Sequence, residues 1–312
     1  MLRVLQWSDT HHNDANVRAT ISLIPTVPQL DMPIHCGDIV EDHYPQELGA
    51  FDPTVSCAVI GNHDTIDESG TNPSGYEWYK QPSQSVLYQK YFSKMKDKFG
   101  LHMEPDTTWW SKEFEDKGVL FIGLNDTVLD DVMTKELEFV KERVSYAESK
   151  GYAIAVAKHG PSNMYNGVKC NFTATYMRGA AFITDKVSYN DTYSLAGEKL
   201  LSPIMQSRCR VLYVLAGHEH GDGFGYITRN DSSRVPYIHV GSGIVDIYND
   251  VARGNATVTS NVVCNMIDYV PEQDALRIYR LGADTSYGGI PRKMLTFSYG
   301  ANRIVSSCGV DE

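Results

Sequence analysis

The sequence predicts an α/β fold, in which buried strands alternate with helices. Short apolar runs rich in β-branched residues recur along the chain, and a charged stretch with helical spacing separates two of them. The 312 residues are 42% hydrophobic and 21% charged, as in ordinary globular proteins. A chain of this size can bury one substantial core or two smaller ones.

Six apolar runs have the length and composition of buried strands. In chain order they are residues 2–8, 32–37, 55–61, 118–125, 152–160 and 210–218. A helix is predicted over residues 135–150, because Leu137, Val140 and Val144 fall on one face and Gly151 follows as a stop signal.

The end of the chain predicts further β-structure. Residues 262–282 have the pattern of a hairpin, and residues 292–300 that of one more strand. Two longer segments, residues 65–117 and 161–198, interrupt the alternation of strands and helices. Because long loops in compact domains are commonly functional, we expect these two segments to contribute to substrate recognition.

Charge and apolar patterning argue against an extended nucleic-acid partner, a membrane helix and a signal peptide. A net charge of −11 disfavours an extended nucleic-acid groove, which needs clustered lysines and arginines. No apolar stretch approaches the roughly 20 residues of a membrane helix. The first ten residues lack the apolar region and cleavage site of a signal peptide, so we expect a cytoplasmic protein.

Side chains that can bind metal follow five of the predicted strands. They are Asp9, His11, Asp38, Asn62, His63, Asp64, His159, His218 and His220. Each alone is as well explained by a surface loop or by a buried, hydrogen-bonded histidine. Because α/β proteins bind ligands at the carboxyl ends of their strands, the recurrence at one sheet edge favours a shared metal site.

The motifs formed by these residues resemble the calcineurin-like metallophosphoesterase family. The family pattern DxH, GDxx(D/E), GNH(D/E), a lone His and GHxH appears in order at residues 9–11, 37–41 and 61–64, at His159 and at residues 217–220. The resemblance implies a four-layer α/β/β/α sandwich with a dinuclear metal site at the strand carboxyl ends. It also implies an enzyme that hydrolyses phosphoric esters.

The resemblance assigns seven ligands to two metal ions. By motif position, one ion would be held by Asp9, His11, Asp38 and His220, and the other by Asp38, Asn62, His159 and His218, with Asp38 bridging. It further implies that His63 donates a proton or contacts the phosphate, and that Asp64 orients His63.

The residue types suit this chemistry on physical grounds. Two divalent cations about 3.5 to 4 Å apart repel each other, so a shared carboxylate such as Asp38 is needed between them. A bridging hydroxide would attack phosphorus, and a protonated His63 would stabilise the leaving oxygen. Mixed oxygen and nitrogen donors suit Mn²⁺, which we expect, and also Fe²⁺, Zn²⁺ or Ni²⁺.

Departures from related families narrow the activity. Purple acid phosphatases carry a tyrosine where this chain has Glu41, so a ferric tyrosinate centre is not expected. Phosphoprotein phosphatases carry arginines where this chain has Asp42 and Ile60, which disfavours protein phosphatase activity. Cyclic-nucleotide phosphodiesterases, nucleotide and nucleotide-sugar hydrolases and general phosphatases remain as models.

Aromatic residues in the two longer segments have two explanations. They are Trp78, Tyr79, Trp109, Trp110, Tyr165 and Tyr176. Such side chains stack on nucleotide bases, but they also pack insertions onto a core. Arg178 has the same ambiguity, as a bidentate phosphate contact or as an exposed helix residue.

We therefore expect a phosphoesterase domain over residues 1–260 and a β-rich extension over residues 261–312, packed on the same domain. The proposed substrate is a small phosphomonoester or phosphodiester, with a nucleotide-like one favoured. The alternative is a structural or interaction protein, such as a virion or surface component, that keeps the phosphoesterase fold. The polar, strand-rich end of the chain motivates that alternative.

Overall fold

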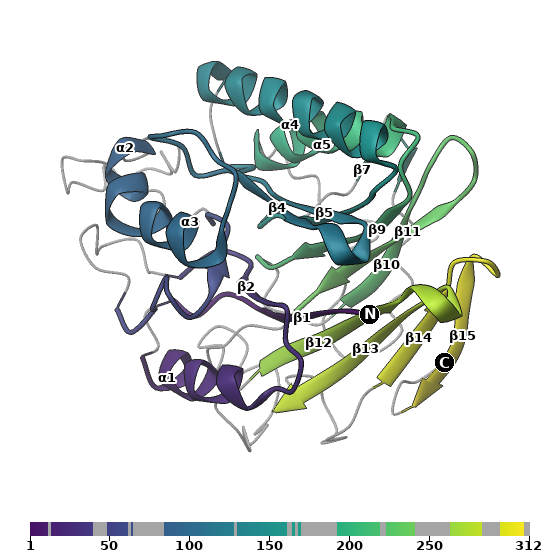
Figure 1. The fold of residues 1–312 in the computed structure, drawn as a ribbon, viewed down its shortest axis with the longest axis horizontal. Helices are drawn as coiled ribbons and strands as arrows, with labels where there is room; N and C mark the ends of the chain where they lie inside the picture. The colour runs from purple at the N-terminus through teal and green to yellow at the C-terminus, as the bar shows by residue number, and fades with distance from the viewer. Residues whose placement is uncertain are drawn as a thin grey trace.

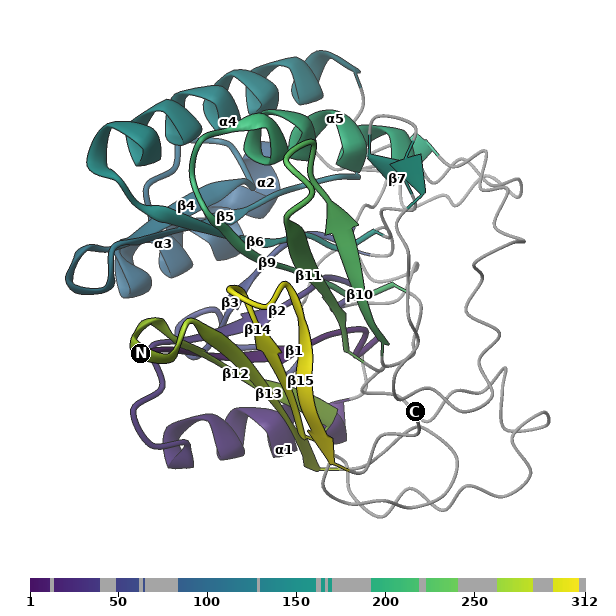
Figure 2. The ribbon, with the colours of Figure 1, turned by 90° about the vertical axis from the view of Figure 1, so that its right-hand side faces the viewer.

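The structure is a computed structural model that describes residues 1–11, 14–39, 49–61, 64, 84–127, 130–160, 164–165, 168–169, 192–218, 223–240, 263–282 and 294–308. It confirms the α/β class. Two mixed β-sheets face each other, and helices cover their outer surfaces (Figures 1 and 2). The layers therefore follow the order helix, sheet, sheet, helix.

The first sheet has seven strands in the order β15-β14-β13-β12-β1-β2-β3. Their bounds are β1 (Leu2–Trp7), β2 (Met32–His35), β3 (Cys57–Ala58), β12 (Val263–Val270), β13 (Ala275–Gly282), β14 (Met294–Ser298) and β15 (Arg303–Cys308). β1, β2 and β3 are parallel, whereas β12 to β15 are antiparallel neighbours that continue the sheet from β1.

The predicted hairpin over residues 262–282 is confirmed as β12 and β13, joined by a short 3₁₀ turn, η4 (Pro271–Gln273). β12 pairs directly with β1, so strands from the two ends of the chain are neighbours in one sheet (Figure 1). The boundary at residue 260 stays a prediction.

The second sheet has six strands in the order β10-β11-β9-β6-β5-β4. Their bounds are β4 (Trp110–Phe114), β5 (Val119–Gly123), β6 (Ala153–Ala157), β9 (Val211–Ala216), β10 (Gly223–Thr228) and β11 (Arg234–His239). β5, β6, β9 and β11 are parallel. Every residue of β5 and β9 is buried, as expected for strands covered on both faces.

The long helices lie on the outer faces of the two sheets. α4 (Asp130–Lys150) and α5 (Thr192–Gln206) cover the six-stranded sheet, and α1 (Asp14–Leu23) lies outside the seven-stranded sheet (Figures 1 and 2). The predicted helix over residues 135–150 is confirmed within α4. Val140 and Val144 are buried against the sheet, and Gly151 ends the helix with φ of +69°.

Shorter elements complete the described chain. They are η1 (Ile24–Thr26), α2 (Gln84–Leu87), the π-helical turn η2 (Tyr88–Phe92), α3 (Ser93–Phe99), η3 (Glu115–Lys117) and the two-stranded hairpin of β7 (Met164–Tyr165) and β8 (Val168–Lys169). The described part of the segment 65–117 is thus largely regular, and it supplies the edge strand β4. No helix among the described residues has both the length and the apolar character needed to cross a membrane.

Two of the aromatic residues considered for stacking belong to the core. Trp109 is 2% exposed and Trp110 is fully buried, where its Nε1–H donates to the carbonyl of Ala58 at 2.8 Å. Packing therefore explains these two side chains. Trp78, Tyr79, Tyr176 and Arg178, and the side chain of Tyr165, lie outside the described residues.

Candidate metal centre

The loops that follow β1 and β2 bring Asp9, His11 and Asp38 together. Their donor atoms lie within 4.8 Å of one another, and all three residues are buried. Each has a left-handed backbone, with φ of +53°, +41° and +56°. This conformation costs of order 1 to 3 kcal/mol per non-glycine residue and tends to cluster at functional sites.

Hydrogen bonds between the two loops maintain this backbone. The N–H of Asp9 donates to the carbonyl of Gly37 at 3.0 Å, and the N–H of His11 donates to the carbonyl of Asp38 at 3.1 Å. Parallel pairing of β1 with β2 places the two loops side by side. The hydrogen-bond ladder between β1 and β2 thus continues past the ends of the strands. It fixes the backbones of the three residues that can bind metal relative to one another.

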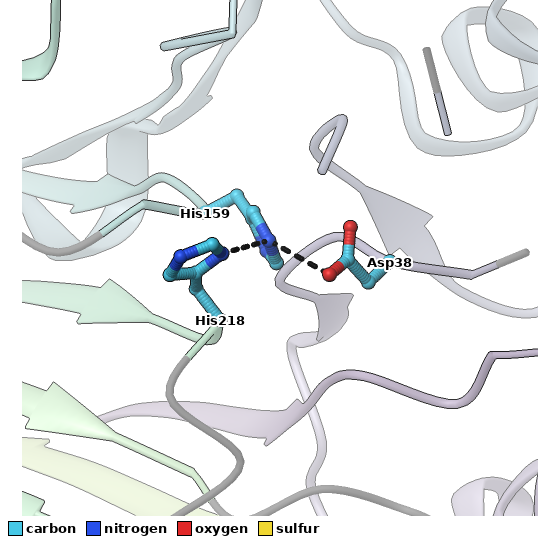
Figure 3. Close-up of side chains that lie close together, drawn as sticks. All are labelled: Asp38, His159 and His218. Carbon is cyan, nitrogen blue, oxygen red and sulfur yellow. Dashed lines mark hydrogen bonds and ion pairs between the residues drawn. The ribbon is translucent and has the colours of Figure 1, made fainter. Parts of the chain in front are cut away.

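A second group contains Asp38, His159 and His218, and its donor atoms also lie within 4.8 Å of one another. Figure 3 shows the three side chains converging, with His159 between the other two. His159 Nε2 lies 3.1 Å from Asp38 Oδ2 and 3.2 Å from His218 Nδ1. His159 follows β6 and His218 follows β9, whereas Asp38 comes from the other sheet.

Asp38 thus belongs to both groups. The oxygen that faces His159, Asp38 Oδ2, also lies 3.6 Å from Nε2 of His11. Asp9 Oδ1 and Oδ2 each lie 3.0 Å from the backbone N–H of His218, which joins the β1 loop to the β9 loop. The two sheets therefore contribute to one site where their parallel strands end.

The surroundings of His159 leave one ring nitrogen for a ligand. Its Nδ1–H donates to the carbonyl of Cys36 at 2.6 Å, so Nε2 faces Asp38 and His218. Burial on its own lowers the pKa of His159, but Asp38 and further carboxylates raise it to about 9. The site therefore carries an excess of negative charge in the interior, which a cation would neutralise.

These donors fit divalent transition metals. Two buried carboxylates and three imidazoles are the mixed oxygen and nitrogen set that such ions accept. Of the seven ligands expected from sequence, the structure brings together Asp9, His11, Asp38, His159 and His218. Asn62 and His220, together with His63, lie outside the described residues.

Asp64 joins two loops of the site. It is 2% exposed, and its Oδ1 accepts the N–H of Ile39 at 2.8 Å while Oδ2 accepts the N–H of Gly61 at 2.9 Å. These bonds connect the residue after Asp38 with the residue before Asn62. That Asp64 also orients His63 stays a prediction.

Sequence reasoning missed Asp126. This fully buried residue follows β5, and its carboxylate accepts the N–H groups of His159 and Gly160 at 3.3 and 3.0 Å. The signal was present, because "GLND" ends a predicted strand with polar residues, as the five motif-bearing strands do. Asp126 therefore holds the backbone of His159 in place, and it is not a member of either candidate ligand group.

Comparisons with known proteins agree with this fold. The family model described as calcineurin-like phosphoesterase matches residues 2–222. A dimetal phosphatase from Danio rerio superposes with a TM-score of 0.54 at 12% identity, covering 96% of this chain and 99% of that one. A structure of PhoD superposes with a TM-score of 0.50 at 11% identity, covering 98% of this chain and 72% of that one. At these identities the likeness shows a shared fold. No curated protein sequence matches the chain.

Proposed function

The chain belongs to the calcineurin-like phosphoesterase family, and from this membership we propose that it hydrolyses a small phosphomonoester or phosphodiester with two divalent metal ions. The observation that carries the proposal is the sharing of Asp38 between two groups of donors. A carboxylate between two cations offsets their mutual repulsion, which is the arrangement that two-metal hydrolysis needs.

Each residue has a definite task in this proposal. Asp9, His11, Asp38, His159 and His218 would hold the ions together with Asn62 and His220. When bound, such ions supply Lewis acidity and make water a nucleophile near neutral pH. His63 would donate a proton to the leaving oxygen of the substrate. Asp64 would hold the loop of His63 in place, since its carboxylate already accepts the N–H of Gly61.

We further propose a nucleotide-like substrate and Mn²⁺ as the metal. Mixed carboxylate and imidazole donors without thiolate support a metal such as Mn²⁺. Aromatic residues of the two longer segments, Trp78, Tyr79, Tyr165 and Tyr176, would stack on a base, an interaction worth about 1 to 3 kcal/mol per base.

The test combines metal analysis with turnover. The purified protein, supplied with Mn²⁺, is expected to bind close to two ions per chain and to hydrolyse p-nitrophenyl phosphate or bis-p-nitrophenyl phosphate. A panel of cyclic nucleotides, nucleotides and nucleotide sugars then identifies the substrate class. Absence of bound metal together with absence of turnover across Mn²⁺, Ni²⁺, Co²⁺ and Zn²⁺ would refute the proposal.

The alternative of a structural or interaction protein rests on the strands after residue 260. In the structure, β12 to β15 extend the seven-stranded sheet from β1, so their apolar faces have a packing role in the same sandwich. Size-exclusion chromatography tests the alternative, which requires large ordered assemblies without turnover.

A further inference from the structure

His35, the last residue of β2, lies between the two loops that carry Asp9, His11 and Asp38. Its side chain is fully buried. One ring nitrogen, Nδ1, lies 3.2 Å from the backbone nitrogen of Gly37, and the other, Nε2, lies 3.1 Å from Thr10 Oγ1. Gly37 directly precedes Asp38, and Thr10 separates Asp9 from His11. His35 therefore contacts both loops next to candidate ligands.

The partners of His35 determine its tautomer. A backbone N–H can only donate, so Nδ1 of His35 must accept from Gly37 and the ring proton must reside on Nε2. Nε2–H then donates to Thr10 Oγ1, and the Thr10 hydroxyl donates to the carbonyl of Ile39 at 3.3 Å. The bonds run in one direction, from the Gly37 amide through two side chains to the Ile39 carbonyl.

Aromatic packing fixes the plane of the His35 ring. The ring of Trp7 meets it edge-on, with centroids 4.5 Å apart, and Phe51 lies at 5.8 Å on a similar edge contact. Burial, followed by the charge of His159, lowers the pKa of His35 to about 3. The ring is therefore neutral near physiological pH, as the acceptor role of Nδ1 requires.

The geometry points to a positioning role for His35 in the metal centre. Its neutral ring fixes the loop of Asp9 and His11 against the loop of Asp38, and through this spacing it sets the affinity for the divalent ions. This inference rests on the proposed function, because it assumes that these three residues bind metal. Asp9, His11 and Asp38 have left-handed backbones. Their positions are therefore sensitive to the hydrogen bonds that His35 makes with the two loops.

The experiment measures Mn²⁺ affinity by calorimetric titration of the chelator-treated full chain. His35→Phe keeps an aromatic ring against Trp7 but removes both hydrogen bonds, and Thr10→Val removes only the hydroxyl. Loss of such supporting contacts typically weakens metal binding by about 10- to 100-fold, which is the range expected for His35→Phe. Thr10→Val should weaken binding in the parent chain and have little further effect when combined with His35→Phe.

Two further variants separate positioning from general stability. His35→Gln places an amide N–H near the position of Nε2 and should recover part of the lost affinity. Leu295→Ala removes buried packing in β14, which three strands separate from β2, so it should lower the melting temperature of the metal-free protein and leave Mn²⁺ affinity unchanged. If His35→Phe fails to fold, Thr10→Val and His35→Gln still give the affinity comparison.

Several results would overturn the inference. They are parental Mn²⁺ affinity in His35→Phe or in Thr10→Val, additive effects in the double variant, and a wild-type protein that binds no divalent ion. A wild-type protein that binds Mn²⁺ but cleaves no phosphoester would instead refute the proposed function, and the affinity comparison would still decide the role of His35.

Discussion

Lys158 Nζ lies 2.6 Å from Asp126 Oδ2 in the interior of the protein, and neither side chain is exposed to solvent. The pair joins the end of β6 to the loop after β5. Lys158 directly precedes His159, and Asp126 accepts the N–H of His159. Lys158 also donates to the carbonyl of Gly160. Burial on its own would raise the pKa of Asp126, but Lys158 and the N–H donors keep it below its ordinary value. Asp126 is therefore a carboxylate in the folded protein.

Removing one charge of this pair should destabilise the fold strongly. Asp126→Asn leaves the Lys158 ammonium buried without a counter-charge, and such a change typically costs about 3 to 5 kcal/mol. Urea denaturation of the metal-free protein measures the loss. The control is Glu142→Gln, because Glu142 is 65% exposed and 3.9 Å from Arg143, a pair expected to contribute about 1 kcal/mol or less. Equal losses of unfolding free energy in the two variants would show that the buried ion pair contributes no more to stability than the exposed one.

Glu136 predicts a pH-dependent stability. This residue of α4 is fully buried, and its Oε1 accepts the N–H of Asn125 at 2.7 Å. Its Oε2 has no hydrogen-bond partner in the part of the chain that the structure describes. Burial raises the pKa of Glu136 well above its ordinary value, so the folded protein favours the neutral carboxyl. The contribution of Glu136 to the free energy of unfolding is fully present below the pKa that this residue has in the unfolded chain. It is lost as the pH rises towards the pKa that the residue has in the folded protein.

Glu136→Gln keeps the acceptor for Asn125 and has no charge to bury. Its free energy of unfolding, relative to the wild type, should therefore increase with pH above about 4.3, by at most about 1.4 kcal/mol per pH unit. Urea denaturation between pH 5 and pH 8, with a chelator present, measures the difference. The matched control is Glu138→Gln, an exposed residue of the same helix, for which no such trend is expected. A constant difference for Glu136→Gln across this range would contradict the assignment.

The atoms around Gly217 at the metal centre leave no space for a side chain. A Cβ atom at this position would lie 1.9 Å from Ser8 Oγ and 2.6 Å from Asp9 Oδ2. Gly217→Ala must therefore displace Ser8 and Asp9, and we expect at least about 10-fold weaker Mn²⁺ binding, as for the loss of a supporting contact. Calorimetric titration with Mn²⁺ provides the measurement.

Gly151→Ala is the control for this substitution. The space around Gly151 is open, and only its left-handed backbone opposes a side chain. It should cost about 1 to 2 kcal/mol of stability and leave Mn²⁺ binding unchanged. If Gly217→Ala bound Mn²⁺ as tightly as Gly151→Ala, the tight packing around Asp9 would have no functional consequence.

Sequence patterns predicted the strands that pack on both faces, because burial makes those strands continuous apolar runs. They did not predict β10 and β11, where Gly225 and Pro236 weaken the strand signal. Pro236 is tolerated because β11 pairs with β9 only from Tyr237 onwards, so its missing N–H removes no bond on that side. The predicted strand over residues 55–61 pairs only at Cys57–Ala58, since the chain then enters the loop of the site.

The supporting residues of the site could not be derived from sequence spacing. The left-handed backbones of Asp9, His11 and Asp38 depend on hydrogen bonds from Asp9 to Gly37 and from His11 to Asp38, between loops far apart in the chain, which no local pattern encodes. His35 has the same difficulty. It falls inside a predicted buried strand, where a histidine has no obvious task, and its partners become visible only when β1 and β2 are paired.

Asn62 and His63 are neighbours in the sequence for which we predict different tasks, one in metal binding and one in chemistry. Asn62→Ala removes a neutral oxygen ligand and should lower the occupancy of one metal ion, while His159 and His218 remain. His63→Ala should leave the metal content nearly unchanged and slow turnover, because its proposed task is to protonate the leaving oxygen. Loss of a positioned general acid typically costs about 10²- to 10⁴-fold in rate.

The choice of leaving group separates the two tasks. The His63→Ala defect should be small for p-nitrophenolate, which scarcely needs a proton, and large for an alkoxide leaving group. Asn62→Ala should instead slow both substrates in proportion to the metal that it loses, and excess Mn²⁺ should restore part of its activity but none of the activity of His63→Ala. Elemental analysis and steady-state rates on a p-nitrophenyl and an alkyl ester provide these comparisons. The general-acid role of His63 would be wrong if His63→Ala lost metal as severely as Asn62→Ala, or slowed both leaving groups equally.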